Sequence, residues 1–258
     1  MQEAEFSGRA VVTGAGQGIG RAIALRLLAA GCTVQAIGRS GDKLATLAEE
    51  AGVTADKVII SALDIQDSAA VGAALTEAAG PLRYLVNSAG VLKPSRLLEV
   101  SEAELREIID INLTATLVLT QKAARFMATE RQGAIVTIGS NSGTTPRTAL
   151  GAYPASKAGL AHAMKCLGLE LADYGVRCNI VSPGSTDTEM QRSFQSDASS
   201  LDRVLKGDPE MWRLGIPLRR MADPDDVTDL VLFLLSEKAR HITMENIVID
   251  GGATLGAR

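Results

Sequence analysis

The stretch of sequence that decides the fold is RAVVTGAGQGIGRAIALRLLAAG, residues 9–31. Residues 9–12 predict a short buried strand, and Ile19, Ile23 and Leu27 recur at the spacing of one face of a helix. A turn with several glycines separates the two elements. A strand, a glycine-rich turn and a helix in this order predict the opening unit of a parallel α/β sheet.

The turn itself, TGAGQGIG at residues 13–20, has the glycine spacing of a dinucleotide-binding fingerprint. Gly14 permits the tight turn, Gly18 lets a pyrophosphate approach the backbone, and Gly20 allows the helix to pack closely on the strand. The free amides and the positive end of the helix dipole would hold the phosphates. The alternative is a glycine turn without a ligand. The expected cofactor contacts of this turn are Gly14, Gln17, Gly18, Ile19 and Gly20.

Apolar runs alternate with helical patterns along the rest of the chain, which predicts one doubly wound parallel sheet of the Rossmann type with helices on both faces. We expect a single domain over residues 1–258, with the polar stretch 187–215 as a substrate lid or, alternatively, a disordered segment. The further expected strands are 33–37, 58–62, 84–86, 134–138, 177–181 and 246–249, and the expected helices are 41–51, 68–79, 101–130 and 153–174.

Composition excludes several classes of protein. The net charge of −4 offers no basic field for nucleic acid or anionic lipid, and the sequence has no apolar run long enough to span a membrane. The start does not read as a signal peptide, so we expect a soluble, cytoplasmic protein. The two histidines are far apart and no CxxC pair occurs, so we expect no metal site. Cys32, Cys166 and Cys178 are interpreted as small buried hydrophobic residues.

Residues 140–157, SNSGTTPRTALGAYPASK, contain the candidate acid–base residues. Tyr153 and Lys157 are four positions apart and share one face of a helix, where an ammonium group would lower the pKa of the phenol from about 10. Ser140 follows an expected strand, and its hydroxyl could hydrogen-bond the substrate oxygen that exchanges a proton with Tyr153. Asn112 lies inside an expected helix, where an asparagine needs a partner, and we expect it to bond water or backbone near Lys157.

Further candidates follow the other strands, because ligands of such sheets bind beyond the carboxyl ends of the strands. Arg39 stands where an acid would bind a ribose 2′-hydroxyl and an arginine a 2′-phosphate; the alternative is a solvated surface arginine. Asp64 is placed to cap the next helix or to contact adenine. The remaining cofactor candidates lie in two small-residue turns and are Asn87, Ala89, Gly90, Pro183 and Gly184.

Taken together, these motifs resemble those of the short-chain dehydrogenase/reductase family, and the resemblance covers essentially the whole chain. It implies a catalytic tetrad in which Tyr153 is the acid/base and Lys157 lowers its pKa and binds the nicotinamide ribose. Ser140 would orient the substrate, and Asn112 would hold a proton-relay water. The resemblance also implies a nicotinamide carboxamide held near Thr186 and Thr188, and a homotetramer built on two long helices.

Four further stretches and the Pro-Arg pair at 146–147 show a closer resemblance. They resemble the 2,3-dihydro-2,3-dihydroxybenzoate dehydrogenases of catechol-siderophore biosynthesis. This resemblance implies oxidation of a cyclohexadiene carboxylate diol to a ketone that tautomerises to the aromatic catechol. Arg147 is placed to bind the substrate carboxylate, or alternatively forms an interface or surface pair. Met190 and Gln191 would line the same pocket from the lid. The further stretches are residues 175–191, 214–218, 241–244 and 250–256.

Two departures from that subgroup leave alternatives open. Gly38 stands where its members carry an acid, so Arg39 favours NADP while the resemblance favours NAD. Phe194 and Gln195 stand where a Leu-Trp pair is frequent, so the ring could carry an amino group, as in 2,3-dihydro-3-hydroxyanthranilate. A further alternative is an NADPH-dependent reductase of 3-oxoacyl or sugar-like ketones. A nucleotide-sensing regulator is disfavoured because the Ser–Tyr–Lys set is intact.

Overall fold

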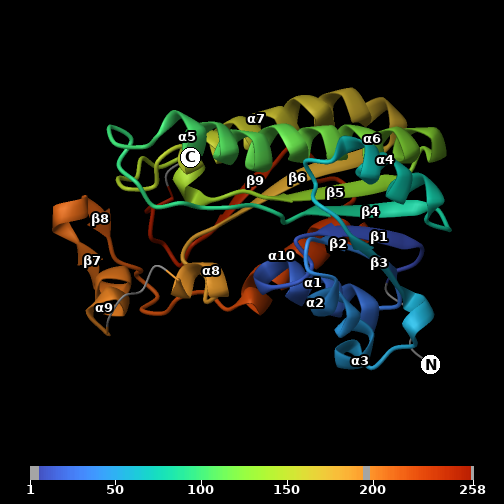
Figure 1. Ribbon diagram of the computed structural model, residues 1–258, viewed down its shortest axis with the longest axis horizontal. Helices are drawn as coiled ribbons and strands as arrows, with labels where there is room; N and C mark the ends of the chain where they lie inside the picture. The colour runs from blue at the N-terminus through green and yellow to red at the C-terminus, as the bar shows by residue number, and fades with distance from the viewer. Residues whose placement is uncertain (1–5, 194–197, 257–258) are drawn as a thin grey trace.

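A parallel sheet of seven strands runs through the residues that the computed structural model describes, which are 6–193 and 198–256 (Figure 1). The strand order is β3-β2-β1-β4-β5-β6-β9. The predicted doubly wound sheet is therefore confirmed. Its strands are β1 (Arg9–Thr13), β2 (Thr33–Gly38), β3 (Val58–Ala62), β4 (Leu82–Asn87), β5 (Gly133–Ile138), β6 (Val176–Pro183) and β9 (Asn246–Ile249).

Helices cover both faces of the sheet (Figure 1). The side chains of β1, which point alternately to the two faces, show which helices lie on each. Ala10 and Val12 point to the face packed by α1 and α10, whereas Val11 points to the face packed by α4, α6 and α7. Both faces are buried, which explains why the strands read as apolar runs instead of alternating patterns. The helices of these two layers are α1 (Gly18–Ala29), α4 (Ser68–Glu77), α5 (Glu102–Ile109), α6 (Thr116–Glu130), α7 (Tyr153–Leu171) and α10 (Pro224–Leu235).

Two of the expected helices are interrupted. The segment 41–51 forms two short helices, α2 (Gly41–Ala45) and α3 (Leu47–Ala51). The long helix expected over 101–130 begins with a capping box formed by Ser101 and Glu104, but a π-helical turn, η2 (Asp110–Ala115), separates α5 from α6. The extra residue in a π-turn locally changes which backbone groups pair, and such turns are frequent at functional sites.

The C-terminal half contains elements that the sequence analysis did not predict. α10 is capped by Asp223, with Pro224 at its start, and it packs on α1. The described part of the predicted lid, residues 187–215, contains two helices and a small antiparallel strand pair; Phe194 and Gln195 lie outside the described residues. Its elements are α8 (Glu189–Arg192), α9 (Ala198–Lys206), β7 (Gly207–Asp208) and β8 (Arg213–Leu214).

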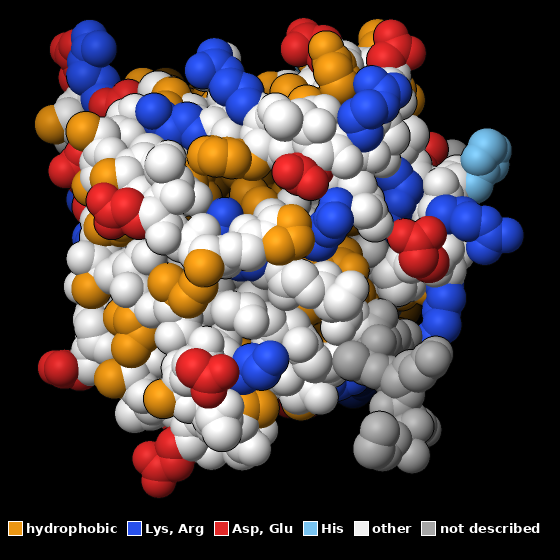
Figure 2. Space-filling model, turned by 90° about the vertical axis from the view of Figure 1, so that its right-hand side faces the viewer, with side chains coloured by type: hydrophobic (Ala, Val, Ile, Leu, Met, Phe, Trp, Pro, Cys, Tyr) orange, Lys and Arg blue, Asp and Glu red, His pale blue; other side chains and the backbone are white. Residues whose placement is uncertain are grey.

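The connections between these elements contain short 3₁₀ turns. These turns are η1 (Ala55–Lys57), η3 (Asn141–Gly143), η4 (Ala172–Tyr174), η5 (Pro209–Met211) and η6 (Glu237–Ala239). No helix within the described ranges has both the length and the apolar character needed to cross a membrane. Figure 2 shows the face on the side of the N-terminus, away from β7 and β8, where acidic and basic side chains are interspersed.

The packing of α10 leads to a stability prediction. Leu234 is fully buried in the cluster shared by α1, α10 and the sheet, whereas the adjacent Phe233 is 40% exposed. Leu234→Ala should lower the free energy of unfolding by about 2–5 kcal/mol, because it leaves a cavity in a close-packed layer. Urea unfolding monitored by circular dichroism measures the loss. Phe233→Ala is the matched control, and an equal loss in both variants would contradict the packing of this helix.

Candidate active site

A cavity of about 720 Å³ lies at the carboxyl ends of the strands. It is lined by residues that follow β1, β2, β4, β5 and β6, together with residues of the lid. All predicted site residues except Asn87 and Asn112 line it. Those that do are Gly14, Gln17, Gly18, Ile19, Gly20, Arg39, Asp64, Ala89, Gly90, Ser140, Arg147, Tyr153, Lys157, Pro183, Gly184, Thr186, Thr188, Met190 and Gln191.

The glycine turn forms one wall of the cavity, and two of its glycines, Gly14 and Gly20, leave no room for a Cβ atom. Gly14 has φ +69°, and a Cβ atom there would lie 2.9 Å from the backbone nitrogen of Ala89. A Cβ atom on Gly20 would lie 2.4 Å from the carbonyl oxygen of Gly14. Gly18 has φ +54° and faces the side chain of Thr188 across the cavity. A bare backbone at the N-terminus of α1 fits the pyrophosphate of a dinucleotide.

Thr13, the last residue of β1, joins this turn to the turn after β4. Its hydroxyl oxygen accepts hydrogen bonds from the backbone amides of Ser88 and Ala89, both at 3.0 Å. The side chain is buried, so these bonds are shielded from water. Sequence analysis did not identify this role, although a hydroxyl residue directly before the glycine turn was a usable signal.

Two basic side chains stand where β2 ends. Arg39 is exposed on the cavity rim and makes no hydrogen bond or ion pair with residues that the structure describes. The Lys43 ammonium donates to Oε1 of Gln17 at 3.0 Å and to Oε2 of Glu189 at 3.1 Å, and so connects α2 to the lid. Asp64 accepts a hydrogen bond from the amide of Gln66 at 2.9 Å, which is a local turn contact.

Asn87 lies behind the cavity wall. Its side-chain amide donates to the hydroxyl groups of Thr120 and Thr137, at 2.9 and 3.0 Å, and it is 2% exposed. The side chain therefore braces β4 against α6 and β5, whereas Ala89 and Gly90 of the same turn line the cavity. Any influence of Asn87 on a cofactor passes through the backbone of this turn.

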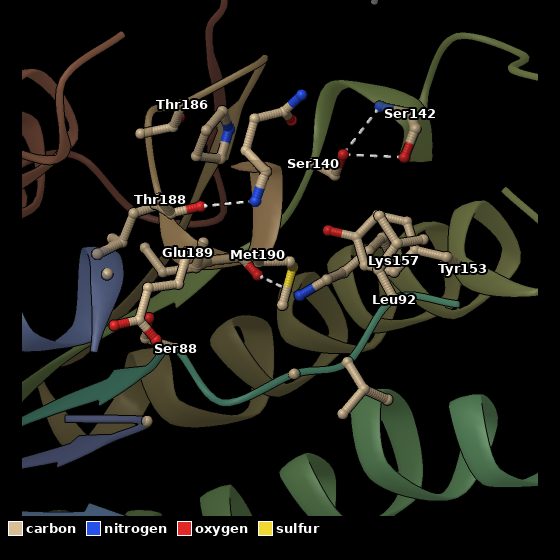
Figure 3. A pocket seen from close by; sticks show the side chains of 18 of the residues that line it. Ser88, Leu92, Ser140, Ser142, Tyr153, Lys157, Thr186, Thr188, Glu189 and Met190 are labelled. Atoms are coloured by element: carbon tan, nitrogen blue, oxygen red, sulfur yellow. Dashed lines mark hydrogen bonds between the residues drawn. The ribbon is translucent and has the colours of Figure 1, made fainter. Parts of the chain in front are cut away.

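The three residues proposed for proton transfer meet in the cavity, as Figure 3 shows. Tyr153 and Lys157 project from the first turn of α7, and Ser140 follows β5. The Ser140 hydroxyl is 2.8 Å from the hydroxyl of Ser142 and accepts from the Ser142 amide at 3.2 Å. The Lys157 ammonium lies over the Tyr153 ring, 5.7 Å from its centroid. The predicted sharing of one helix face is thus seen directly.

The structure corrects the expected direction of the tyrosine pKa. Burial raises the pKa of Tyr153 to about 12, with the Ser140 hydroxyl opposing that rise. Burial also lowers the pKa of Lys157 to about 8. The expected lowering of the phenol pKa assumed a direct contact with the ammonium, which instead donates to the carbonyl oxygen of Ile138 at 2.8 Å. Desolvation therefore outweighs the attraction between the two groups.

Asn112 lies in the π-turn η2, completely buried, and its side chain is not part of the cavity lining. Its Oδ1 accepts from the Val91 amide at 2.8 Å, and its Nδ2 donates to the Val91 carbonyl at 2.8 Å and to Ser156 Oγ at 3.2 Å. Of the two expected partners, water or backbone, the side chain uses backbone. It holds the strand-to-helix connection after Gly90 against α7.

The end of β6 supplies another wall. Thr186 is buried, and Thr188 caps α8 by accepting a hydrogen bond from the amide of Gln191 at 3.2 Å. Gly184 packs so closely on the chain that a Cβ atom there would lie 2.7 Å from Cβ of Asp250. Thr188 also faces Gly18 of the glycine turn, and the predicted nicotinamide contacts of Thr186 and Thr188 stay a prediction.

The opposite end of the cavity is rich in arginine. Arg147 is half-buried there, and burial lowers the pKa of its guanidinium group. Met190 and Gln191 face the same space from α8. The sequence analysis missed Arg203 and Arg213, which line this end from the lid. No periodic pattern or motif around them gave a signal, because their position depends on how the lid folds back.

Residues 9–199 match the family model described as short chain dehydrogenase. The protein therefore belongs to this family of NAD(P)-dependent oxidoreductases. The chain is 42% identical over 250 residues, 96% of each chain, to the 2,3-dihydro-2,3-dihydroxybenzoate dehydrogenase of Bacillus subtilis strain 168. It is 39% identical over 251 residues, again 96% of each chain, to the vibriobactin-specific 2,3-dihydro-2,3-dihydroxybenzoate dehydrogenase of Vibrio cholerae serotype O1.

A similar solved structure is that of levodione reductase. It matches with a TM-score of 0.88 at 25% identity, over 96% of this chain and 98% of that one. The likeness of the folds extends over nearly the whole length of both chains, so the elements that line the cavity fall within the shared architecture.

The buried ammonium of Lys157 leads to a prediction about pH. Its pKa is lowered from 10.5 to about 8 in the folded protein, so the unfolded chain binds more protons between these values. The free energy of unfolding of wild type minus that of Lys157→Met should therefore rise with pH across this window. The rise should be on the order of 3 kcal/mol.

Chemical denaturation of both proteins from pH 7 to 10.5 measures this difference. Lys165→Met, at an exposed position of the same helix, is the matched control for the change of side chain. A wild-type advantage that stays constant with pH would show that Lys157 is not held in a desolvated site.

Proposed function

We propose that the protein oxidises 2,3-dihydro-2,3-dihydroxybenzoate, a cyclohexadiene carboxylate diol, to the catechol acid 2,3-dihydroxybenzoate. The observation that carries the proposal is the shared cavity of Arg147 and the Ser140–Tyr153–Lys157 set. A cation able to bind a ring carboxylate and residues able to exchange a proton with a ring hydroxyl line one cavity, which supports the proposal. The relatives named for this reaction support the same substrate class.

In this proposal, Ser140 and Tyr153 bind the ring hydroxyl that becomes the ketone. Tyr153 as phenolate accepts the hydroxyl proton while hydride leaves the same carbon, and the ketone then tautomerises to the aromatic ring. A nicotinamide dinucleotide supplies the hydride acceptor when bound. The high pKa of Tyr153 means that its own proton has to be passed on first. The positive charge of Lys157 over the ring face favours the phenolate.

Removal of the phenolic hydroxyl tests this assignment. Tyr153→Phe should lower kcat by at least about 10²-fold, because general base catalysis typically contributes about 10²–10⁴-fold. Binding of reduced cofactor, followed by fluorescence, should remain within a factor of a few. Formation of reduced nicotinamide is measured by absorbance with the dihydroxy acid as substrate. Turnover by Tyr153→Phe at the wild-type rate would reject the mechanism.

For the cofactor, we infer a preference for NADP. The side chain of Arg39 stands at the cavity rim without a partner among the described residues, and Gly38 offers no carboxylate for a ribose 2′-hydroxyl. A free guanidinium is suited to a 2′-phosphate. Lys43, close to the same rim, adds a second positive charge although it is paired with Glu189. The competing expectation of NAD rests on the resemblance to the dihydroxybenzoate dehydrogenases and on the fit of NAD to a dehydrogenation driven by aromatisation.

The preference can be inverted by one substitution. Arg39→Asp should raise KM for NADP by about 10- to 150-fold, because hydrogen bonds to charged groups contribute about 1.5–3 kcal/mol. KM for NAD should change little or fall. Steady-state kinetics with both cofactors measure the ratio, and Arg96→Asp, an exposed arginine outside the cavity, is the matched control. An equal effect on both cofactors would contradict the role of Arg39.

Two alternatives share the same acid–base residues. A ketone reductase of the 3-oxoacyl type is favoured by Arg39, since such reductions draw on NADPH. It would replace the main proposal if the protein reduced such ketones and ignored the cyclohexadiene acid. Oxidation of the amino analogue, 2,3-dihydro-3-hydroxyanthranilate, was suggested by Phe194 and Gln195. Assays of the two ring substrates with each cofactor separate these readings.

We further propose a single-domain protein that assembles as a homotetramer and acts in the cytoplasm. Phe126 on α6 and Leu169 on α7 are exposed apolar side chains, 37% and 68% exposed, on the two long helices expected at the interface. The three cysteines are free in the described structure, which supports a reducing compartment. Cys32 and Cys178 are buried as expected, whereas the interpretation of Cys166 as a buried residue was wrong, because its side chain is exposed.

A further inference from the structure

Arg213 is held in the cavity by a small hairpin of the lid. β7 and β8 pair antiparallel, with Asp208 opposite Arg213. Gly207 has φ +102°, and a Cβ atom there would lie 2.9 Å from the Arg213 carbonyl, so the hairpin requires glycine at this position. The Asp208 side chain caps the turn by accepting from the Met211 amide. Arg213 thus projects from a defined turn.

The guanidinium of Arg213 is half-buried and has donors to spare. Its Nη2 donates to Ser185 Oγ at 2.8 Å, just beyond β6. It forms no ion pair within residues 6–193 and 198–256. A guanidinium carries five N–H donors, so one bond to a serine leaves most of them directed elsewhere. The group lines the same cavity as Tyr153.

Arg147 approaches the same space from the loop before α7. It makes neither a hydrogen bond nor an ion pair with the rest of the described chain. Burial lowers the pKa of both arginines, and the charge of Arg147 lowers that of Arg213 further, while the charges of Asp250 and Asp208 act in the opposite direction on Arg147 and Arg213 respectively. Two like charges in a half-buried site favour the binding of an anion.

The acidic side chains nearby are engaged elsewhere. The carboxylate of Asp250 accepts from Asn141, from the amide of Gly252 and from the hydroxyl of Thr254. Asp208 caps its own turn and lies 4.0 Å from Arg203, the third arginine of the cavity. Within the described residues, therefore, no carboxylate forms an ion pair with Arg147 or Arg213, although the charges of Asp250 and Asp208 act on them from a greater distance.

We propose that Arg213 and Arg147 together bind the carboxylate of the substrate, one from the lid and one from the loop before α7. The proposal rests on the function proposed above and extends its recognition site. A contact between the two segments supports it, because the Thr148 hydroxyl donates to the Met211 carbonyl at 3.3 Å.

The experiment compares two ligands that differ only in the carboxylate, 2,3-dihydroxybenzoate and catechol, by calorimetry on the cofactor-bound protein. Wild type should bind 2,3-dihydroxybenzoate more tightly than catechol. Arg213→Gln should weaken binding of the acid by about 10-fold or more, because it removes a charge-assisted contact, and should leave catechol within about twofold. Arg213→Lys keeps the charge but not the planar fork of the guanidinium group. Its affinity for the acid should lie between those of wild type and Arg213→Gln.

Arg219→Gln, an exposed arginine of the same segment outside the cavity, is the matched control and should change neither affinity. An equal loss for both ligands in Arg213→Gln, or no loss for the acid, would overturn the proposal. Turnover of the dihydroxy acid is measured separately on wild type. If wild type binds the acid through Arg213 but does not oxidise it, the proposed anion site is supported and the proposed function is rejected.

Discussion

The site depends on the burial of one ammonium group, that of Lys157. The side chain is 5% exposed, and its Nζ donates to the carbonyl of Ile138 at the end of β5. Space around it is tight: a Cβ atom on Gly90 would lie 3.6 Å from Nζ and 3.2 Å from Oδ1 of Asn112. The same cation lies over the Tyr153 ring. One desolvated charge therefore lies where the ends of β4 and β5 meet α7.

The parts of the site that obey local rules could be predicted from the sequence. The four-residue spacing of Tyr153 and Lys157 places both on one face of α7 whatever surrounds it. Gly20 is required by a backbone contact with Gly14 within the first βα unit, and Gly14 by its own positive φ, so both follow from a short motif, although the close contact of Gly14 with Ala89 comes from beyond that unit. The pKa of Tyr153 was predicted with the wrong sign, because desolvation depends on elements that pack from elsewhere in the chain.

Other features required knowledge of distant contacts. Arg213 reaches the cavity through a hairpin of two-residue strands, too short to produce a periodic pattern. The π-turn that contains Asn112 has no sequence signal beyond an asparagine in a helix, and its partners on Val91 lie in another connection. The omission of α10 has a different cause. Its signals were present, namely the capping box that begins at Asp223 and the apolar stripe after Pro224.

The distribution of charge links recognition to chemistry. A phenolate at Tyr153 is favoured by positive potential, yet an anionic ring brings a negative charge into the same cavity. Two guanidinium groups that share one carboxylate keep one positive charge between them, so the substrate does not cancel the field that the base requires. A single arginine would be neutralised by the same carboxylate. The second arginine, on the lid, thus allows an acid to bind beside a residue that has to lose a proton.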